Sequence, residues 1–136
     1  MIMTGIQKYI EEMKQKYGDS IIIKMRTCDK KILEQIPQPL KEFYYIYDSI
    51  RFPFGDIYSP KINDNDDSFI SEGWFKFGFD GYFSYWLCSY EEDEDRLWIT
   101  PWDHEVHDVI EGVYSTLVEF LQDIEDEYQE YHEADD

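Results

Sequence analysis

The hydrophobic positions at the start of the chain repeat with the period of a helix. They fall on one helical face and are Ile6, Tyr9, Ile10, Met13 and Tyr17. Thr4 with Gln7 matches a capping box, and Gly18 is a residue at which helices commonly stop. We therefore expect a first helix over residues 5–17.

The next fifty residues change pattern several times. Residues 21–25 form a β-branched run that we interpret as an edge strand, and residues 30–35 form a helical turn that ends before Pro37. Pro39 suits the first position of a helix. Apolar residues then recur at helical spacing, which predicts a helix that continues to about residue 50: Leu40, Phe43, Tyr44, Tyr47 and Ile50.

From residue 51 the pattern favours strands. Residues 54–59 read as a strand, and the polar residues 61–68 as an exposed loop. Two aromatic runs, 74–79 and 82–88, flank the turn dipeptide Asp80-Gly81 and predict a β-hairpin. Because both runs are aromatic on both faces, the hairpin should lie inside the sheet, with helices on at least one side.

After an acidic turn, residues 96–100 predict a further strand that ends before Pro101. Thr116 and Glu119 then form a second capping box at the start of a long helix. The apolar face of that helix comprises Leu117, Phe120, Leu121, Ile124, Tyr128 and Tyr131, and the opposite face is almost wholly acidic. Residues 131–136 are expected to fray.

Together these elements predict one α+β domain over residues 1–136. It has N-terminal helices, a central antiparallel or mixed sheet and a C-terminal helix. The length of 136 residues suits a single core.

Charge is distributed very unevenly. The chain holds 12 Lys and Arg against 31 Asp and Glu, a formal charge of −19. Residues 1–61 are nearly neutral, whereas residues 62–136 contain only Lys76 and Arg96 as basic residues. Such a field repels nucleic acid and anionic membranes and attracts basic proteins or cations. The plain alternative is that the carboxylates only keep the protein soluble.

Location and redox state follow from simple features. The first 18 residues lack the apolar core of a secretory signal, and no stretch has the ~20 apolar residues of a membrane span, so we expect a cytoplasmic protein. Cys28 and Cys88 stand sixty positions apart, outside any CxxC motif. We expect both to be reduced and buried.

Motifs for catalysis or metal binding are weak. His104-Glu105-Val106-His107 is one residue short of the HExxH spacing that places two imidazoles on one helical face. Residues 63–67 resemble a calcium loop without its glycine and closing glutamate. No GxSxG, GxxxxGK[ST] or GxGxxG pattern occurs. We therefore expect no enzyme activity, no metal and no cofactor.

Three ordered segments resemble the SUKH superfamily. Residues 36–44, IPQPLKEFY, look like its "(L/I)-P-x-x-(Y/L)-K-x-F" opening. The Trp74 strand followed by Asp80-Gly81 looks like its central W…G-x-D-G hairpin, and residues 115–121, STLVEFL, like its "S-F-x-x-F-L" terminal helix. The chain has Asp48-Ser49 where the family often has Asn-Gly.

The resemblance implies a binding function. Many bacterial members are immunity proteins that neutralise toxins, often nucleases, and a fungal branch regulates cell-wall synthesis. It also implies a mixed sheet packed by helices, whose exposed face and adjoining loops bind partners. We expect an immunity protein, monomeric or weakly dimeric, that covers the basic active surface of a toxin. The alternatives are a regulatory or scaffold domain of the same fold, and a hydrolase that uses carboxylates or His104 and His107.

The partner-binding candidates are acidic loop residues and aromatic residues near them. They are Asp64, Asp66, Asp67, Tyr82, Tyr85, Glu91, Glu92, Asp93, Glu94, Asp95 and Trp102. Strand alternation places Tyr82 with Trp86 on one face and Tyr85 on the other. We assign Trp74 and Phe120 to the core. For Trp98 and Trp102, which flank Pro101, the edge of a concave surface is an alternative to a structural position.

Overall fold

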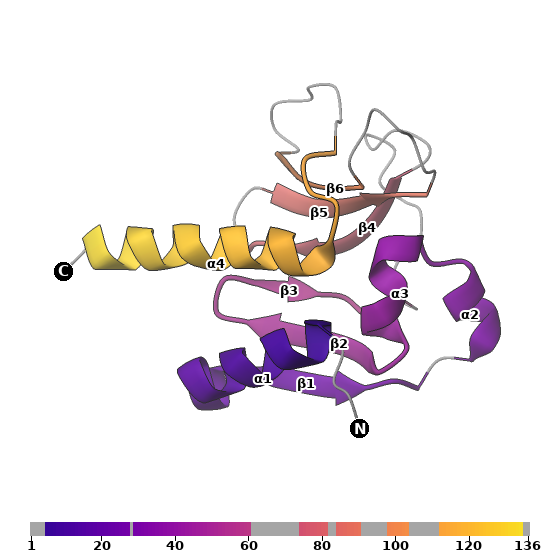
Figure 1. Cartoon of the computed structure of the whole chain (residues 1–136), viewed down its shortest axis with the longest axis horizontal. Coiled ribbons are helices and arrows are strands. Elements are labelled where there is room, and N and C mark those ends of the chain that lie inside the picture. The colour runs from indigo at the N-terminus through magenta and orange to yellow at the C-terminus, as the bar shows by residue number, and fades with distance from the viewer. Residues whose placement is uncertain are drawn as a thin grey trace.

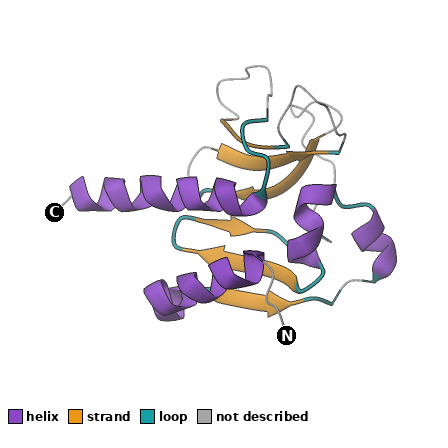
Figure 2. Cartoon of the chain, in the orientation of Figure 1, coloured by secondary structure: helices purple, strands orange, loops and turns teal. Residues whose placement is uncertain are grey.

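The computed structural model describes residues 5–27, 29–60, 74–81, 84–90, 98–103 and 112–134. Helices and strands in these residues form one α+β domain (Figures 1 and 2). In chain order they are α1 Gly5–Tyr17, the 3₁₀ turn η1 Gly18–Ser20, β1 Ile22–Met25, α2 Lys30–Glu34, α3 Gln38–Tyr44, β2 Tyr47–Phe52, β3 Gly55–Ile57, β4 Trp74–Phe79, β5 Ser84–Ser89, β6 Ile99–Asp103 and α4 Leu117–Ala134.

The six strands form one sheet in sequence order, and each pairs antiparallel with the next. Of the two alternatives that the sequence left open, the sheet is therefore antiparallel and not mixed. β1 lies at its edge, as expected, and the β4–β5 hairpin lies inside it. The hairpin turns at Gly81, whose φ of 88° suits glycine, and the Asp80 carboxylate accepts the Ser84 N–H at 3.1 Å.

The first helix has the predicted bounds and the predicted buried face. Ile6, Tyr9, Ile10 and Met13 are buried. Gly18 follows the helix with a φ of 58°, the left-handed conformation that ends helices. Thr4 lies outside the described residues.

The helix that begins at Pro39 is much shorter than predicted. It ends at Tyr44, and Tyr47–Phe52 form strand β2 between β1 and β3. Tyr47 and Ile50 are buried from this strand, so their spacing of three matched a helix by coincidence. Pairing with strands on both sides outweighs the local helical pattern because β1 and β3 together supply partners for the backbone groups that β2 directs to either side.

Two other strands differ from their predicted bounds. β3 covers only Gly55–Ile57 of the predicted residues 54–59. β6 starts at Ile99 and runs through Pro101 to Asp103, whereas we expected it to end before the proline. Because β6 is the last strand of the sheet, the N–H that Pro101 lacks costs no essential ladder hydrogen bond.

Helices α1, α3 and α4 cover one face of the sheet (Figure 1). The core between them is strongly aromatic. Trp86 packs edge-on to Phe120 of α4, with ring centroids 5.2 Å apart, and Phe52 stacks on Phe54 at 4.8 Å. Phe120 is fully buried, as predicted, whereas Trp74 is half-buried on the opposite face of the sheet.

Helix α4 packs on α1 through polar as well as apolar contacts. Glu125 is buried and accepts hydrogen bonds from Lys16 Nζ and, at 2.9 Å, from the Tyr17 hydroxyl. The Tyr9 hydroxyl donates to the Leu121 carbonyl at 3.2 Å. These contacts fix which side of α4 faces the core.

The C-terminal end of α4 corrects two expectations. The helix continues to Ala134, so residues 131–134, which we expected to fray, are helical. Tyr131 is 72% exposed, so it is not part of the buried face to which we assigned it. In the described part of the chain, no helix is long and apolar enough to span a membrane.

Candidate interaction surface

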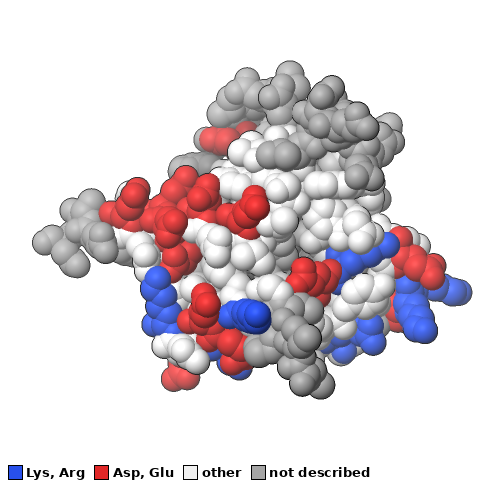
Figure 3. Space-filling view, in the orientation of Figure 1, with Lys and Arg blue, Asp and Glu red and all other residues white. Residues whose placement is uncertain are grey.

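The exposed side of α4 is a continuous acidic face. Its side chains, which we call the acidic ridge, are Glu119, Asp123, Asp126, Glu127 and Glu130. Leu117–Ala134 contains no Lys or Arg. In Figure 3, acidic side chains accordingly gather over α4. The ridge is thus a negatively charged surface on a rigid element.

The spacing along the ridge is unfavourable for the helix itself. Glu119 and Asp123, Asp123 and Glu127, and Asp126 and Glu130 are each four residues apart, so like charges face one another. Like-charge pairs at this spacing destabilise a helix by about 0.2–0.5 kcal/mol each. The packing of α4 on the core therefore holds together an arrangement that an isolated helix would disfavour.

Hydroxyl groups hold the first two ridge carboxylates. The Ser115 hydroxyl donates to Glu119 Oε2 at 3.3 Å, and the Tyr114 hydroxyl donates to Asp123 Oδ2 at 2.8 Å. Burial and then this hydrogen bond raise the pKa of Tyr114 to about 12, so it stays a donor at neutral pH. The Thr116 Oγ1 accepts the Glu119 N–H at 3.2 Å, which confirms the predicted N-cap.

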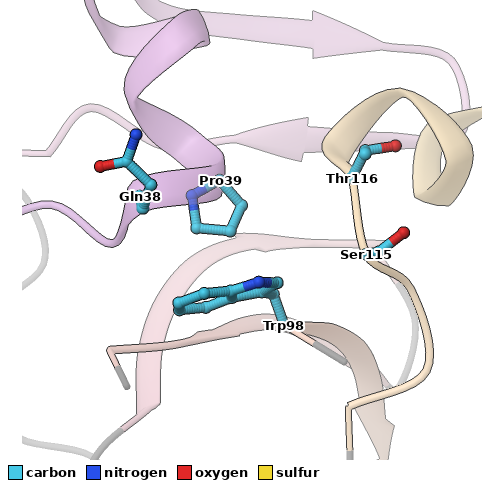
Figure 4. A pocket seen from close by; sticks show the side chains of 5 residues that line it. All are labelled: Gln38, Pro39, Trp98, Ser115 and Thr116. Atoms are coloured by element: carbon cyan, nitrogen blue, oxygen red, sulfur yellow. The ribbon is translucent and has the colours of Figure 1, made fainter. Parts of the chain in front are cut away.

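A pocket of about 540 Å³ lies next to the start of the acidic ridge. It is lined by Gln38, Pro39, Trp98, Ser115 and Thr116. Figure 4 shows the Trp98 indole lying flat beneath the Pro39 ring, with Ser115 and Thr116 across the opening. Trp98 therefore lies at a concave surface, one of the two positions that the sequence left open for it.

A second hollow, of about 630 Å³, lies over β1, β2 and β3. Its lining has mixed charge because it includes Lys24 and Arg51 as well as Asp48 and Asp56. Arg51 Nε is 3.5 Å from Asp56 Oδ1, and the buried Asp48 accepts a hydrogen bond from Ser59 at 2.9 Å. This hollow is less suited to a basic partner than the acidic ridge is.

Two of the aromatic binding candidates lie in the described residues. Tyr85 and Trp102 belong to a small hydrophobic cluster on the sheet face opposite to Trp86, as the strand alternation predicted for Tyr85. Tyr85 is half-buried, its ring is 5.1 Å from that of Phe79, and Lys76 Nζ lies 4.6 Å from it. Trp102 is only 6% exposed, so little of its ring is available to a partner in this conformation.

The other binding candidates lie outside the described residues: Asp64, Asp66, Asp67, Tyr82, Glu91, Glu92, Asp93, Glu94 and Asp95. The same holds for His104, His107 and Cys28. Within the described ranges, no group of three or more His, Cys, Asp or Glu side chains is placed to hold a metal ion.

Cys88 is the cysteine that the structure describes. It is a free thiol, fully buried in the main core, and burial raises its pKa above the usual value. The thiolate, which is the nucleophilic form, is therefore disfavoured. The thiol is accordingly a packing group of the core.

Sequence reasoning missed the pocket at the start of α4. It brings together residues near positions 38, 98 and 115, which no local pattern connects. The capping box at Thr116 was the one local signal, because it placed a helix start there.

Comparison of the chain with protein-family models, with curated proteins and with solved structures found no match. The resemblance to the SUKH superfamily therefore rests on the three sequence segments alone.

Proposed function

We propose that this chain is a SUKH-type immunity protein that binds a cognate toxin, a nuclease in the first instance, and covers its basic active surface. The observation that carries the proposal is the acidic ridge, an exposed face with five carboxylates on a helix that contains no Lys or Arg. A nuclease presents basic residues to the phosphates of its substrate, so such a ridge complements it.

The elements that carry the family-like segments add support. The segment at residues 36–44 covers the start of α3, the Trp74 segment with Asp80-Gly81 is the β4–β5 hairpin, and residues 115–121 start α4. The first and the third of these segments meet at the pocket beside Trp98. Residues that resemble family motifs thus adjoin the acidic ridge.

Inhibition in this proposal is steric and electrostatic. The carboxylates of the ridge accelerate encounter with a basic domain and accept charge-assisted hydrogen bonds from it. The bound protein then keeps the anionic substrate away from the active surface. The acidic loop residues Glu91 to Asp95 extend the negative field in sequence and are further candidates for contact.

A co-expression assay tests the proposal. The toxin is the C-terminal domain of a large protein encoded beside this chain, and the readout is growth of cells that express the domain with or without the chain. We expect growth to be restored and the two proteins to co-purify. Continued toxicity with both proteins expressed would refute the proposal.

Two rival functions give other results. A regulatory or scaffold domain would co-purify with a non-toxic cellular protein and would give no protection. A hydrolase that uses His104 and His107 would take up a metal ion stoichiometrically, and the double variant His104→Ala/His107→Ala would abolish that uptake.

A further inference from the structure

The pocket beside Trp98 combines an aromatic wall with negative charge at its rim. Ser115 lines the pocket, and its hydroxyl lies 3.3 Å from Glu119 Oε2, so this carboxylate is one hydrogen bond away from the pocket lining. Asp123 follows one turn later, held by Tyr114 at 2.8 Å. We propose that this pocket is the anchor site for one arginine side chain of the partner, an inference that rests on the proposed function.

The aromatic wall suits a guanidinium group. Trp98 is half-buried, and its indole packs against the core on one side and lines the pocket on the other. A cation within about 6 Å of the centre of an indole ring, over its face, is attracted by the negative charge of that face. Trp is the side chain for which this attraction is strongest.

The rim supplies the hydrogen-bond acceptors that arginine needs. Glu119 keeps a carboxylate oxygen beyond the one that binds the Ser115 hydroxyl. The Gln38 side chain lines the same pocket next to Pro39. A planar guanidinium, with five N–H donors, can stack on an aromatic ring and bind the Glu119 carboxylate at the same time, which an ammonium group does less well.

Other occupants fit the pocket less well. An anion would be repelled by Glu119, and the first turn of α4 already has its N-cap at Thr116. A purely apolar group would lie beside the Glu119 carboxylate without gaining any interaction with its charge. The aliphatic part of an arginine side chain can pack on the apolar wall of the pocket while its guanidinium group binds the carboxylate.

Peptide titration followed by NMR tests the inference. The probes are acetyl-Gly-Arg-Gly-amide and the same peptide with citrulline, the neutral isostere of arginine. The readout is the indole N–H resonance of Trp98 in ¹⁵N-labelled protein at low salt, assigned with Trp98→Phe. We expect a saturating shift with the arginine peptide and roughly fivefold weaker binding of the citrulline peptide.

Matched variants separate a local contact from the general negative field. Glu119→Gln removes the negative charge beside the pocket and leaves the Thr116 cap of α4 in place. Glu127→Gln removes one charge two turns further along α4. We expect Glu119→Gln to weaken the arginine peptide several-fold and Glu127→Gln to leave it nearly unchanged. Equal binding of both peptides, equal effects of both variants, or no shift of Trp98 would overturn the inference.

The co-expression assay distinguishes the two proposals. With a protecting wild-type chain, Trp98→Leu should reduce toxin affinity at least tenfold, while circular dichroism verifies that the variant is folded. Unchanged affinity of the folded variant would overturn the arginine pocket and leave the immunity function standing. If the arginine peptide binds selectively but the chain gives no protection against the toxin, the arginine pocket stands and the immunity function is overturned.

Discussion

Trp86 is the residue around which the sheet and α4 pack. Its ring is fully buried, contacts Phe120 of α4, and lies against the backbone of two neighbouring strands at Gly55 and Gly78. A Cβ on Gly78 would lie 2.6 Å from the indole and 2.4 Å from the Asp56 carbonyl. Glycine at position 78 therefore makes room for the tryptophan.

Gly78→Ala should accordingly destabilise the protein by about 3 kcal/mol, because neither a buried ring nor a backbone carbonyl can move away cheaply. Gly81→Ala is the control. It has open space around it and a φ of 88°, so only the backbone strain of about 1 kcal/mol applies. Urea unfolding of the two variants measures both values, and equal losses would contradict this account of Trp86.

Lys16 and Lys14 lie on the same helix and differ in the burial of their partners. Lys16 pairs with the buried Glu125, whereas Lys14 pairs with the exposed Glu11 at 3.2 Å. Lys16→Met should lower the free energy of unfolding by about 1–3 kcal/mol, since it leaves a buried carboxylate with Tyr17 as its donor. Lys14→Met should change it by less than about 0.5 kcal/mol. Denaturant unfolding of both variants gives the comparison.

Tyr17 and Tyr114 predict a loss of stability at alkaline pH. Burial, followed by a hydrogen bond to Glu125 or Asp123, raises the pKa of each to about 12 from 10.0. Their contribution is fully present below pH 10 and is lost between pH 10 and 12, because the unfolded chain releases these protons first.

Unfolding midpoints measured from about pH 9 to 11.5 should therefore fall with a slope that Tyr114→Phe reduces. Tyr45→Phe, which removes the hydroxyl of an exposed tyrosine, is the control. A slope that is the same in the wild type and in Tyr114→Phe would contradict the prediction.

At the scale of elements, the sequence predicted best where the pattern was long or the turn chemistry specific. The helix over 5–17 and the hairpin at Asp80-Gly81 were predicted because periodicity and turn residues agreed. Residues 45–50 were assigned wrongly because the spacing of three between Tyr47 and Ile50 matches a helix. In β2 a register shift between Tyr47 and Ser49 lets both side chains face the core, and only the pairing with distant strands reveals it. The predicted end of the strand before Pro101 was wrong for a similar reason. A strand tolerates proline only at the edge of a sheet, and the sequence does not show that β6 lies there.

Helix α4 should become more stable when the repulsion between its carboxylates four residues apart is removed. Glu127→Lys replaces the like-charge pair of Asp123 and Glu127 with an attractive pair at the same spacing. We expect the free energy of unfolding to rise by about 0.5–1 kcal/mol, measured by urea, while affinity for the basic partner falls. A variant that is both more stable and equally tight in binding would argue against a binding role for this part of the ridge.

For the whole molecule, the sequence predicted the distribution of charge better than it predicted the position of pockets. The sequence showed that the acidity is concentrated after residue 61, and the structure places five of these carboxylates on one exposed helix face. The pocket beside Trp98 was not predictable, because its walls come from three segments that only the fold brings together. Tyr85 and Trp102 show a related limit, since strand alternation assigns a face but not its exposure.

If the acidic ridge attracts a basic toxin, the rate at which the two proteins associate must depend on the charge of the ridge. Stopped-flow mixing with the protected toxin domain would compare the wild type with Asp126→Asn/Glu127→Gln/Glu130→Gln. The control, Glu12→Gln/Asp19→Asn/Glu34→Gln, removes the same charge from exposed sites elsewhere.

We predict that the ridge variant associates about tenfold more slowly at low ionic strength, that the control slows far less, and that the difference disappears at about 1 M salt. Association of the ridge variant at the wild-type rate, or equal slowing of the control, would contradict the claim.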